Sequence, residues 1–154
     1  MKVVRVGFIA AAVLAMATLS FAQKPDFSGT WTLDEAASGT AGGGGGGGRG
    51  GGGLGNGGTV KQTADALTVE RMAGENKITA TYKLDGSESK NTMMGRGGQM
   101  EAVSTVKFDG GKMIITSKVG ENDSTQVWSL AGDVLTIEVT SARGTQKRVY
   151  KKTT

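Results

Sequence analysis

The sequence has no cysteine and no histidine among its 154 residues. Without cysteine the chain can form no disulfide, no thiolate nucleophile and no thiolate metal site. Without histidine it lacks the usual general base near neutral pH, a Ser-His-Asp triad and the commonest zinc ligand. The acidic residues lie mostly singly in the sequence, so no paired acid–base arrangement emerges. We therefore predict a protein that is not an enzyme, with no cofactor and no metal site.

The chain also has little net charge and almost no proline. The formal net charge is +4, and two of the positive charges, Lys2 and Arg5, precede the apolar N-terminal stretch. A nearly neutral remainder gives no electrostatic case for a polyanion, so we expect no nucleic-acid partner. The one proline is Pro25, so none of the later segments lacks an amide donor for a central β-strand.

A long apolar run occurs only near the N-terminus. Lys2 and Arg5 come before the apolar stretch from Val6 to Leu19, and the small residues of Ser20-Phe21-Ala22 follow it. This order is typical of a cleaved signal peptide, because a membrane-spanning helix needs about 20 apolar residues. We predict a signal peptide over residues 1–22 and one domain over residues 23–154, periplasmic or secreted from a bacterium and not membrane-spanning after cleavage.

Glycine, in contrast, is abundant and concentrated in one place. Fifteen of the twenty residues from Gly39 to Gly58 are glycine. Such a segment has little apolar surface to bury in exchange for its chain entropy. We predict a flexible glycine-rich insertion over residues 35–58, within the single domain.

The rest of the chain alternates apolar and polar residues at a period of two. In the opening stretch Phe27, Gly29, Trp31 and Leu33 fall on one face of an extended strand and the polar residues on the other. Turn signals then recur every 8 to 12 residues, which is typical of an antiparallel barrel or sandwich. With the opening strand we expect ten strands, the other nine at 59–63, 66–72, 77–84, 87–93, 100–108, 112–119, 124–130, 133–141 and 145–152.

An up-and-down meander places alternate connections at opposite ends of the sheet. The turns at Asp65, Asp85, Asp109 and Asp133 then share one end, which we expect to be closed by the large side chains Phe27, Trp31, Phe108 and Trp128. The glycine-rich insertion shares the other, open end with the loop from Met94 to Gln99. Met93, Met94 and Met100 flank that loop and are candidates for an adaptable apolar mouth, or for ordinary packing at the rim.

The first and last strands carry a family resemblance. With Gly29-Thr30-Trp31 in one and Arg148-Val149-Tyr150 in the other, the chain resembles the lipocalin and fatty-acid-binding-protein (calycin) superfamily, and most of all exported bacterial lipocalin-like proteins that begin with Asp-Phe-Ser-Gly-Thr-Trp. The resemblance implies an all-β barrel in which the first-strand tryptophan packs beneath a last-strand arginine, here Trp31 and Arg148. It also implies a ligand-carboxylate clamp of Arg148 and Tyr150. The helical lid of the fatty-acid binders is replaced here by glycines.

The side chains of the clamp allow two interpretations. A guanidinium and a phenol on one strand face can hold a carboxylate, but an arginine near a tryptophan can instead be structural, through cation–π packing and hydrogen bonds to strand ends. Tyr82 is open to the same two interpretations, as a ligand contact or a core residue.

Two functions from different classes therefore remain open. The first is an exported carrier of a small hydrophobic or amphipathic ligand. The second is a solid-cored module of the cell envelope that binds another envelope protein and no small molecule. The volume of the barrel interior separates them, because a ligand site usually needs about 300 Å³ or more.

Overall fold

The computed structural model describes residues 24–39, 53–95 and 98–153. The predicted signal peptide, most of the glycine-rich insertion and Arg96 lie outside these ranges. The described residues form ten strands: β1 (Gly29–Leu33), β2 (Gly57–Gln62), β3 (Ala66–Ala73), β4 (Asn76–Lys83), β5 (Ser89–Gly95), β6 (Gly98–Asp109), β7 (Lys112–Val119), β8 (Asn122–Ala131), β9 (Val134–Ser141) and β10 (Gly144–Thr153). No helix in the described ranges is long and apolar enough to cross a membrane.

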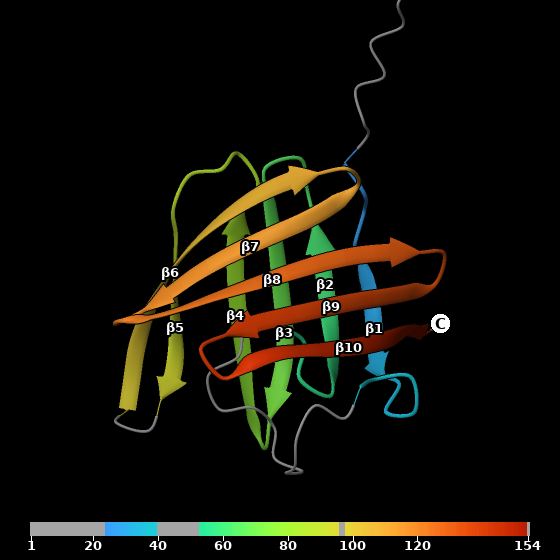
Figure 1. Cartoon of the computed structure of the whole chain (residues 1–154), viewed down its shortest axis with the longest axis horizontal. Coiled ribbons are helices and arrows are strands. Elements are labelled where there is room, and N and C mark those ends of the chain that lie inside the picture. The colour runs from blue at the N-terminus through green and yellow to red at the C-terminus, as the bar shows by residue number, and fades with distance from the viewer. Residues whose placement is uncertain (1–23, 40–52, 96–97, 154) are drawn as a thin grey trace, which may run out of the picture.

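The ten strands form one antiparallel sheet in the order β4-β3-β2-β1-β10-β9-β8-β7-β6-β5. Every sequential pair except β4 and β5 is hydrogen-bonded, and β1 pairs with β10, with Trp31 opposite Lys152. Figure 1 shows β8, β9 and β10 crossing in front of β1 to β4, so the sheet curls back over itself. The predicted all-β meander of ten strands is confirmed, and it is nearly closed into a barrel.

The seam between β4 and β5 is bridged by side chains instead of a backbone ladder. The Asn91 side chain accepts a hydrogen bond from the Thr81 amide (2.8 Å) and donates one to the Thr81 carbonyl (3.0 Å). The Ser89 hydroxyl accepts one from the Lys83 amide at 2.7 Å. Side chains of β5 thus satisfy backbone groups that an exposed sheet edge would leave unpaired.

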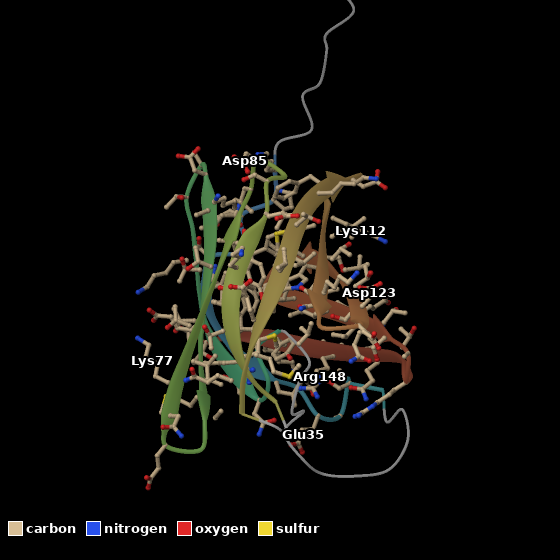
Figure 2. All side chains as sticks on the ribbon, turned by 90° about the vertical axis from the view of Figure 1, so that its left-hand side faces the viewer. Glu35, Lys77, Asp85, Lys112, Asp123 and Arg148 are labelled. Carbon is tan, nitrogen blue, oxygen red and sulfur yellow. The ribbon has the colours of Figure 1, made fainter. Side chains whose placement is uncertain are left out.

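The two ends of the barrel carry different side chains. Figure 2 shows Asp85 at one end and Glu35 at the other. Near the Asp85 end, Phe27 and Trp128 pack edge to face with ring centroids 5.8 Å apart. The Trp31 indole donates to the Phe27 carbonyl (3.0 Å), and all three rings are fully buried. Phe108 is half-buried, with the Lys24 ammonium 5.1 Å from its ring centroid.

The last residues of the predicted glycine-rich insertion, 53–58, belong to the described structure. Leu54 is fully buried, and β2 begins at Gly57, inside the range 35–58 that we expected to be flexible. β2 therefore starts two residues before the strand predicted at 59–63. Two glycines are required there by close approach: a Cβ on Gly57 would lie 2.6 Å from the Trp31 carbonyl oxygen, and one on Gly58 would lie 2.4 Å from that of Glu70.

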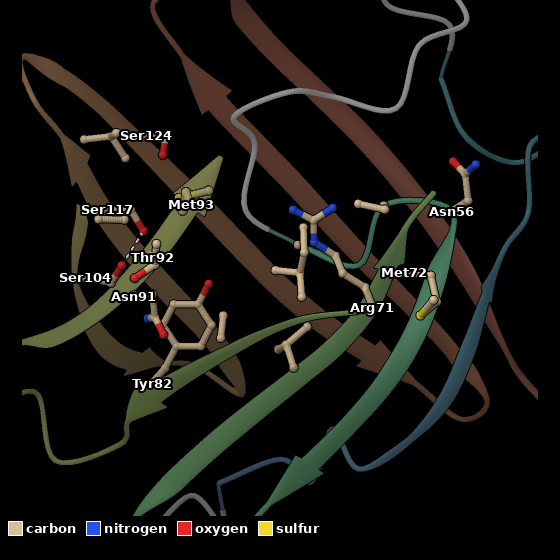
Figure 3. A pocket seen from close by; sticks show the side chains of 18 of the residues that line it. Asn56, Arg71, Met72, Tyr82, Asn91, Thr92, Met93, Ser104, Ser117 and Ser124 are labelled. Atoms are coloured by element: carbon tan, nitrogen blue, oxygen red, sulfur yellow. Dashed lines mark hydrogen bonds between the residues drawn. The ribbon is translucent and has the colours of Figure 1, made fainter. Parts of the chain in front are cut away.

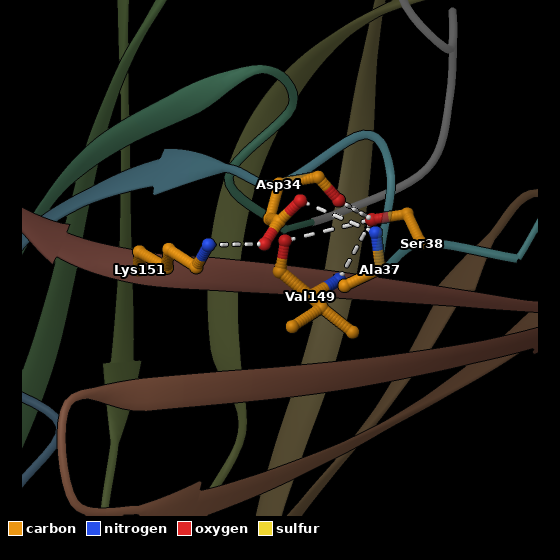
Figure 4. A network of polar contacts seen from close by, with 5 residues as sticks. All are labelled: Asp34, Ala37, Ser38, Val149 and Lys151. Carbon is orange, nitrogen blue, oxygen red and sulfur yellow. Dashed lines mark hydrogen bonds and ion pairs between the residues drawn. The ribbon is translucent and has the colours of Figure 1, made fainter.

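The other side of the insertion is fixed by a polar network (Figure 4). The Asp34 carboxylate accepts a hydrogen bond from the Ala37 amide (3.2 Å) and pairs with the Lys151 ammonium (2.7 Å). The Ser38 hydroxyl accepts one from the Val149 amide at 3.0 Å. The hydrogen bond from Lys151 and that from the Ala37 amide hold the pKa of Asp34 below its ordinary value. The chain that leaves β1 is therefore held against β10.

Candidate functional site

A cavity of about 440 Å³ lies inside the barrel at the end of the glycine-rich insertion. It lies between β3, β4 and β5 on one side and β6, β7 and β8 on the other, and residues 53–56 contribute to its lining. Figure 3 shows its lining side chains. Its volume lies within the usual range for a small-molecule site.

The walls of the cavity are of two kinds. One group of lining residues is apolar: Val69, Ile78, Ala80, Met93, Ala102 and Val119. A second group carries hydroxyl or amide groups: Asn91, Thr92, Ser104, Ser117 and Ser124. Ser104 and Ser117 hydrogen-bond to each other at 2.8 Å. The cavity therefore suits an amphipathic molecule better than a plain hydrocarbon.

Arg71 is the one charged residue among the described residues that line the cavity. It lies on β3 in the alternation of Leu67 and Val69, both buried, so its side chain points inward, and Figure 3 shows the guanidinium reaching into the cavity. Its neighbour Glu70 points outward and pairs with Lys61 (3.5 Å) and Lys77 (3.2 Å). Within the described ranges Arg71 forms no ion pair, so the cavity holds an uncompensated positive charge.

Tyr82 contributes a second polar group to the same cavity. It is 6% exposed, and Figure 3 shows its hydroxyl directed toward the cavity. Burial raises the pKa of Tyr82, and the nearby Arg71 charge offsets part of this rise. The phenol is therefore neutral at physiological pH and can donate a hydrogen bond. Within the described residues its hydroxyl has no hydrogen-bond partner, so it is available to a ligand.

Alkaline pH should reveal the burial of the tyrosines. Burial raises the pKa of both Tyr82 and Tyr150, so the folded state favours the neutral phenols. Their contribution to stability is complete below the unfolded pKa of about 10 and is lost as pH rises through the folded values. We expect an absorbance titration of tyrosinate, at about 295 nm, to show ionisation only above pH ~10, together with loss of the fold. Two tyrosines that titrate near pH ~10 in a protein that stays folded would contradict the burial.

Arg148 and Tyr150 are engaged elsewhere. The Arg148 guanidinium donates to the Gly55 carbonyl oxygen at 3.2 Å, and the Tyr150 hydroxyl donates to the same atom at 3.0 Å. Neither residue lines the cavity. Burial raises the pKa of Tyr150, partly offset by the Arg148 charge, so this phenol is also a donor. The predicted carboxylate clamp is thus brought together by β10, but its oxygen acceptor is a backbone carbonyl of the chain itself.

The cation over the first-strand tryptophan is not the one that the resemblance implies. The Lys152 ammonium lies 5.6 Å from the centroid of the Trp31 ring. Lys152 follows Tyr150 by two residues in β10, on the same face of the strand. Arg148 lies opposite Ile137 and bonds to Gly55 instead. Lys152 fills the role because the register of β1 and β10 places it directly across from Trp31.

The three methionines at the rim do not behave alike. Met93 lines the cavity and lies opposite Met100 in the β5–β6 ladder. Met100 is 38% exposed and its terminal methyl group lies near Gly120, in the turn between β7 and β8. Met94 lies opposite Gln99, and its side chain is outside the described part of the structure.

Sequence reasoning missed Arg71 as a site residue. The sequence places it at the open end with other arginines, but only the strand alternation Leu67, Val69, Arg71 shows that it points inward. Glu70 and Arg71 are adjacent in the sequence, which suggests an ion pair between them. Successive side chains of a strand point to opposite faces of the sheet, so the two cannot pair. The parity of Arg71 within its own strand was the available signal.

Comparison with solved structures identifies the fold. The REP1-NXSQ fatty acid transporter superposes with a TM-score of 0.61 at 17% identity, covering 82% of this chain and 96% of that one. Human cRBP IV gives 0.56 at 17% identity, covering 84% and 99%. A secretory abundant heat soluble protein from Ramazzottius varieornatus gives 0.52 at 22% identity, covering 62% and 67%. No family model matches the sequence, and no curated protein matches it either.

These similarities and the strand order define the fold of the protein. It has the calycin-like fold of lipocalins and fatty-acid-binding proteins, as the first- and last-strand residues predict. At this level of identity the similarity concerns the fold, and function has to be argued from the cavity.

Proposed function

We propose that this protein binds a small amphipathic anion in the barrel cavity, with the carboxylate or a similar group on Arg71 and Tyr82. The observation that carries the proposal is the inward Arg71 charge in a cavity where no described lining residue is acidic. The Arg71 side chain is half-buried and has no anionic partner in the described residues, so an anionic ligand can supply a charge-assisted hydrogen bond there. The apolar residues of the cavity suit a hydrocarbon portion and the hydroxyl residues suit polar substituents.

One solved structure of similar fold carries a name that agrees with this proposal. It is named a fatty acid transporter, and its match covers 82% of this chain. We also infer that the signal peptide delivers the mature chain to the periplasm or the exterior and that the protein has no catalytic activity. A cavity of about 440 Å³ favours the carrier over the solid-cored envelope module, which requires a filled interior.

The test is a calorimetric titration of the protein with two anions, octanoate and the sulfonate probe 8-anilinonaphthalene-1-sulfonate. Arg71→Gln should weaken binding of either anion by about 10- to 100-fold, because a hydrogen bond to a charged group contributes about 1.5–3 kcal/mol. Tyr82→Phe should weaken it less, since it removes one neutral donor while the ring still fills its site.

The control for charge is Arg143→Gln. Arg143 is exposed in the turn between β9 and β10, at the same end of the barrel, and does not line the cavity. It should leave the affinity unchanged while removing the same formal charge. Equal losses in the two variants, or no saturable binding by the unaltered protein, would rule out the proposed site.

A further inference from the structure

The segment that forms one boundary of the cavity is held by two hydrogen bonds from β10. Residues 53–56, which we call the floor segment, place Gly53, Gly55 and Asn56 in the cavity lining. Arg148 and Tyr150 both donate to the Gly55 carbonyl oxygen, at 3.2 and 3.0 Å. Two donors from one strand on one acceptor fix that atom relative to β10.

Leu54 anchors the same segment from the other side. It is fully buried and belongs to the hydrophobic core cluster, while its neighbours line the cavity. Its carbonyl oxygen accepts a hydrogen bond from the Gly57 amide (3.0 Å), and the Asn56 carbonyl oxygen accepts one from the Leu33 amide (3.1 Å). The floor segment therefore occupies interior space with an apolar side chain and a carbonyl group, as a bound amphipathic molecule would.

The floor segment also adjoins two polar side chains of the interior, Arg71 and Gln126. A Cβ on Gly55 would lie 3.6 Å from the Arg71 guanidinium, so the proposed anion-binding charge rests against the floor. A Cβ on Gly53 would lie 3.5 Å from the amide oxygen of Gln126. The amide nitrogen of this buried glutamine has no hydrogen-bond partner in the described residues. Arg71 and Gln126 are thus both covered by the same four residues.

We propose that Leu54 and Gly55 determine the length of ligand that the cavity accepts, and that Arg148 and Tyr150 are positioning residues that hold this floor and do not contact the ligand. The inference rests on the proposed function, because it assigns the specificity of the same cavity. The inference and a ligand clamp predict opposite effects on binding. If Arg148 and Tyr150 hold the floor, replacing them should admit longer ligands. If they clamp the ligand, replacing them should abolish binding.

The binding test uses saturated carboxylates from hexanoate through octanoate, decanoate and dodecanoate to hexadecanoate. For the unaltered protein we expect affinity to rise with length and then to fall at hexadecanoate. Leu54→Ala, and separately Arg148→Met combined with Tyr150→Phe, should raise the ratio of hexadecanoate to octanoate affinity by about tenfold, since each additional buried methylene contributes about 0.8 kcal/mol. Octanoate binding should still require Arg71 in both variants.

Loss of binding of all lengths in the folded Arg148→Met/Tyr150→Phe variant would overturn the inference in favour of a clamp. An unchanged length preference in both variants would overturn it as well. Circular dichroism and thermal unfolding establish that each variant is folded. If the unaltered protein binds no member of the series, the proposed function fails, and the floor is then decided by the next measurement alone.

Amide hydrogen exchange tests the floor without any ligand. The Gly57 and Leu33 amides donate to the floor segment, so their exchange should be at least about tenfold faster in Arg148→Met/Tyr150→Phe than in the unaltered protein. The amides of β7 should not change, and Arg143→Gln should leave all of them unchanged. Unaltered exchange at Gly57 and Leu33 would show that Arg148 and Tyr150 do not hold the floor.

Discussion

Trp128→Ala is expected to lower the free energy of unfolding by about 3–5 kcal/mol, a large fraction of the roughly 5–15 kcal/mol that keeps a typical domain folded. Trp128 is fully buried and its ring packs edge to face against Phe27. Its indole nitrogen donates to the amide oxygen of Gln126 at 3.1 Å. The alanine variant loses the ring contacts and leaves Gln126 with no partner at either end of its amide. Urea denaturation followed by far-ultraviolet circular dichroism measures the change.

Gln126 provides the matched control for this prediction. Gln126→Leu alone should destabilise the protein, because it leaves the Trp128 indole without an acceptor. Combining it with Trp128→Phe removes both polar partners and keeps most of the apolar volume, so the double variant should be more stable than the sum of the single changes. Strict additivity would show that the hydrogen bond between the two side chains does not matter.

The alternation of side chains and the turn residues were sufficient to predict the fold. The period of two assigns every buried residue of β7 and β9 to one face, including Met113, Ile115, Leu135 and Ile137. The turns form where the sequence predicts them, because glycine accepts the positive φ they need: Gly86 has a φ of 86°. These signals are local, so the sequence alone carries them.

The floor segment was not predictable by the same means. Composition identifies residues 35–58 as a loop, since glycine has no side chain to bury, yet Gly57 and Gly58 lie in β2 because only glycine fits between neighbouring backbones. The partner of Arg148 was equally hidden, because Gly55 is 93 residues away in the chain. Contacts of this range depend on the closed sheet, and a pattern within one strand does not encode them.

The polar character of residues 87–93 was a more informative signal. These residues have no clear apolar face, so the alternation alone does not fix how this strand pairs. The structure answers that β5 is an edge strand whose Asn91 and Ser89 side chains replace a backbone ladder to β4. Short polar side chains on this strand are therefore part of the closure, since they reach the Thr81 and Lys83 backbone across the seam.

Gly58→Ala is expected to have the second-largest effect and to lower the free energy of unfolding by about 1–3 kcal/mol. The added Cβ would lie 2.4 Å from the Glu70 carbonyl oxygen, 3.1 Å from a methyl group of Leu54 and 3.2 Å from the Cβ of Arg71. The nearest of these atoms is backbone, so β2 and β3 must separate to accept it. The measurement is urea denaturation, with octanoate titration of the folded variant, because the displaced residues adjoin both the floor and Arg71.

Gly39→Ala is the matched control, because a Cβ at Gly39 would meet no atom of the described residues within 4 Å. It makes the same chemical change beside the same insertion, and it should leave stability within about 0.5 kcal/mol of the unaltered protein. If both variants are equally stable, close approach at Gly58 does not constrain the sheet. If Gly58→Ala lowers stability and octanoate affinity together while Gly39→Ala changes neither, the glycines of residues 57–58 position the floor as well as the strand. The glycine-rich stretch then ends in a segment selected for its backbone contacts, which its composition alone conceals.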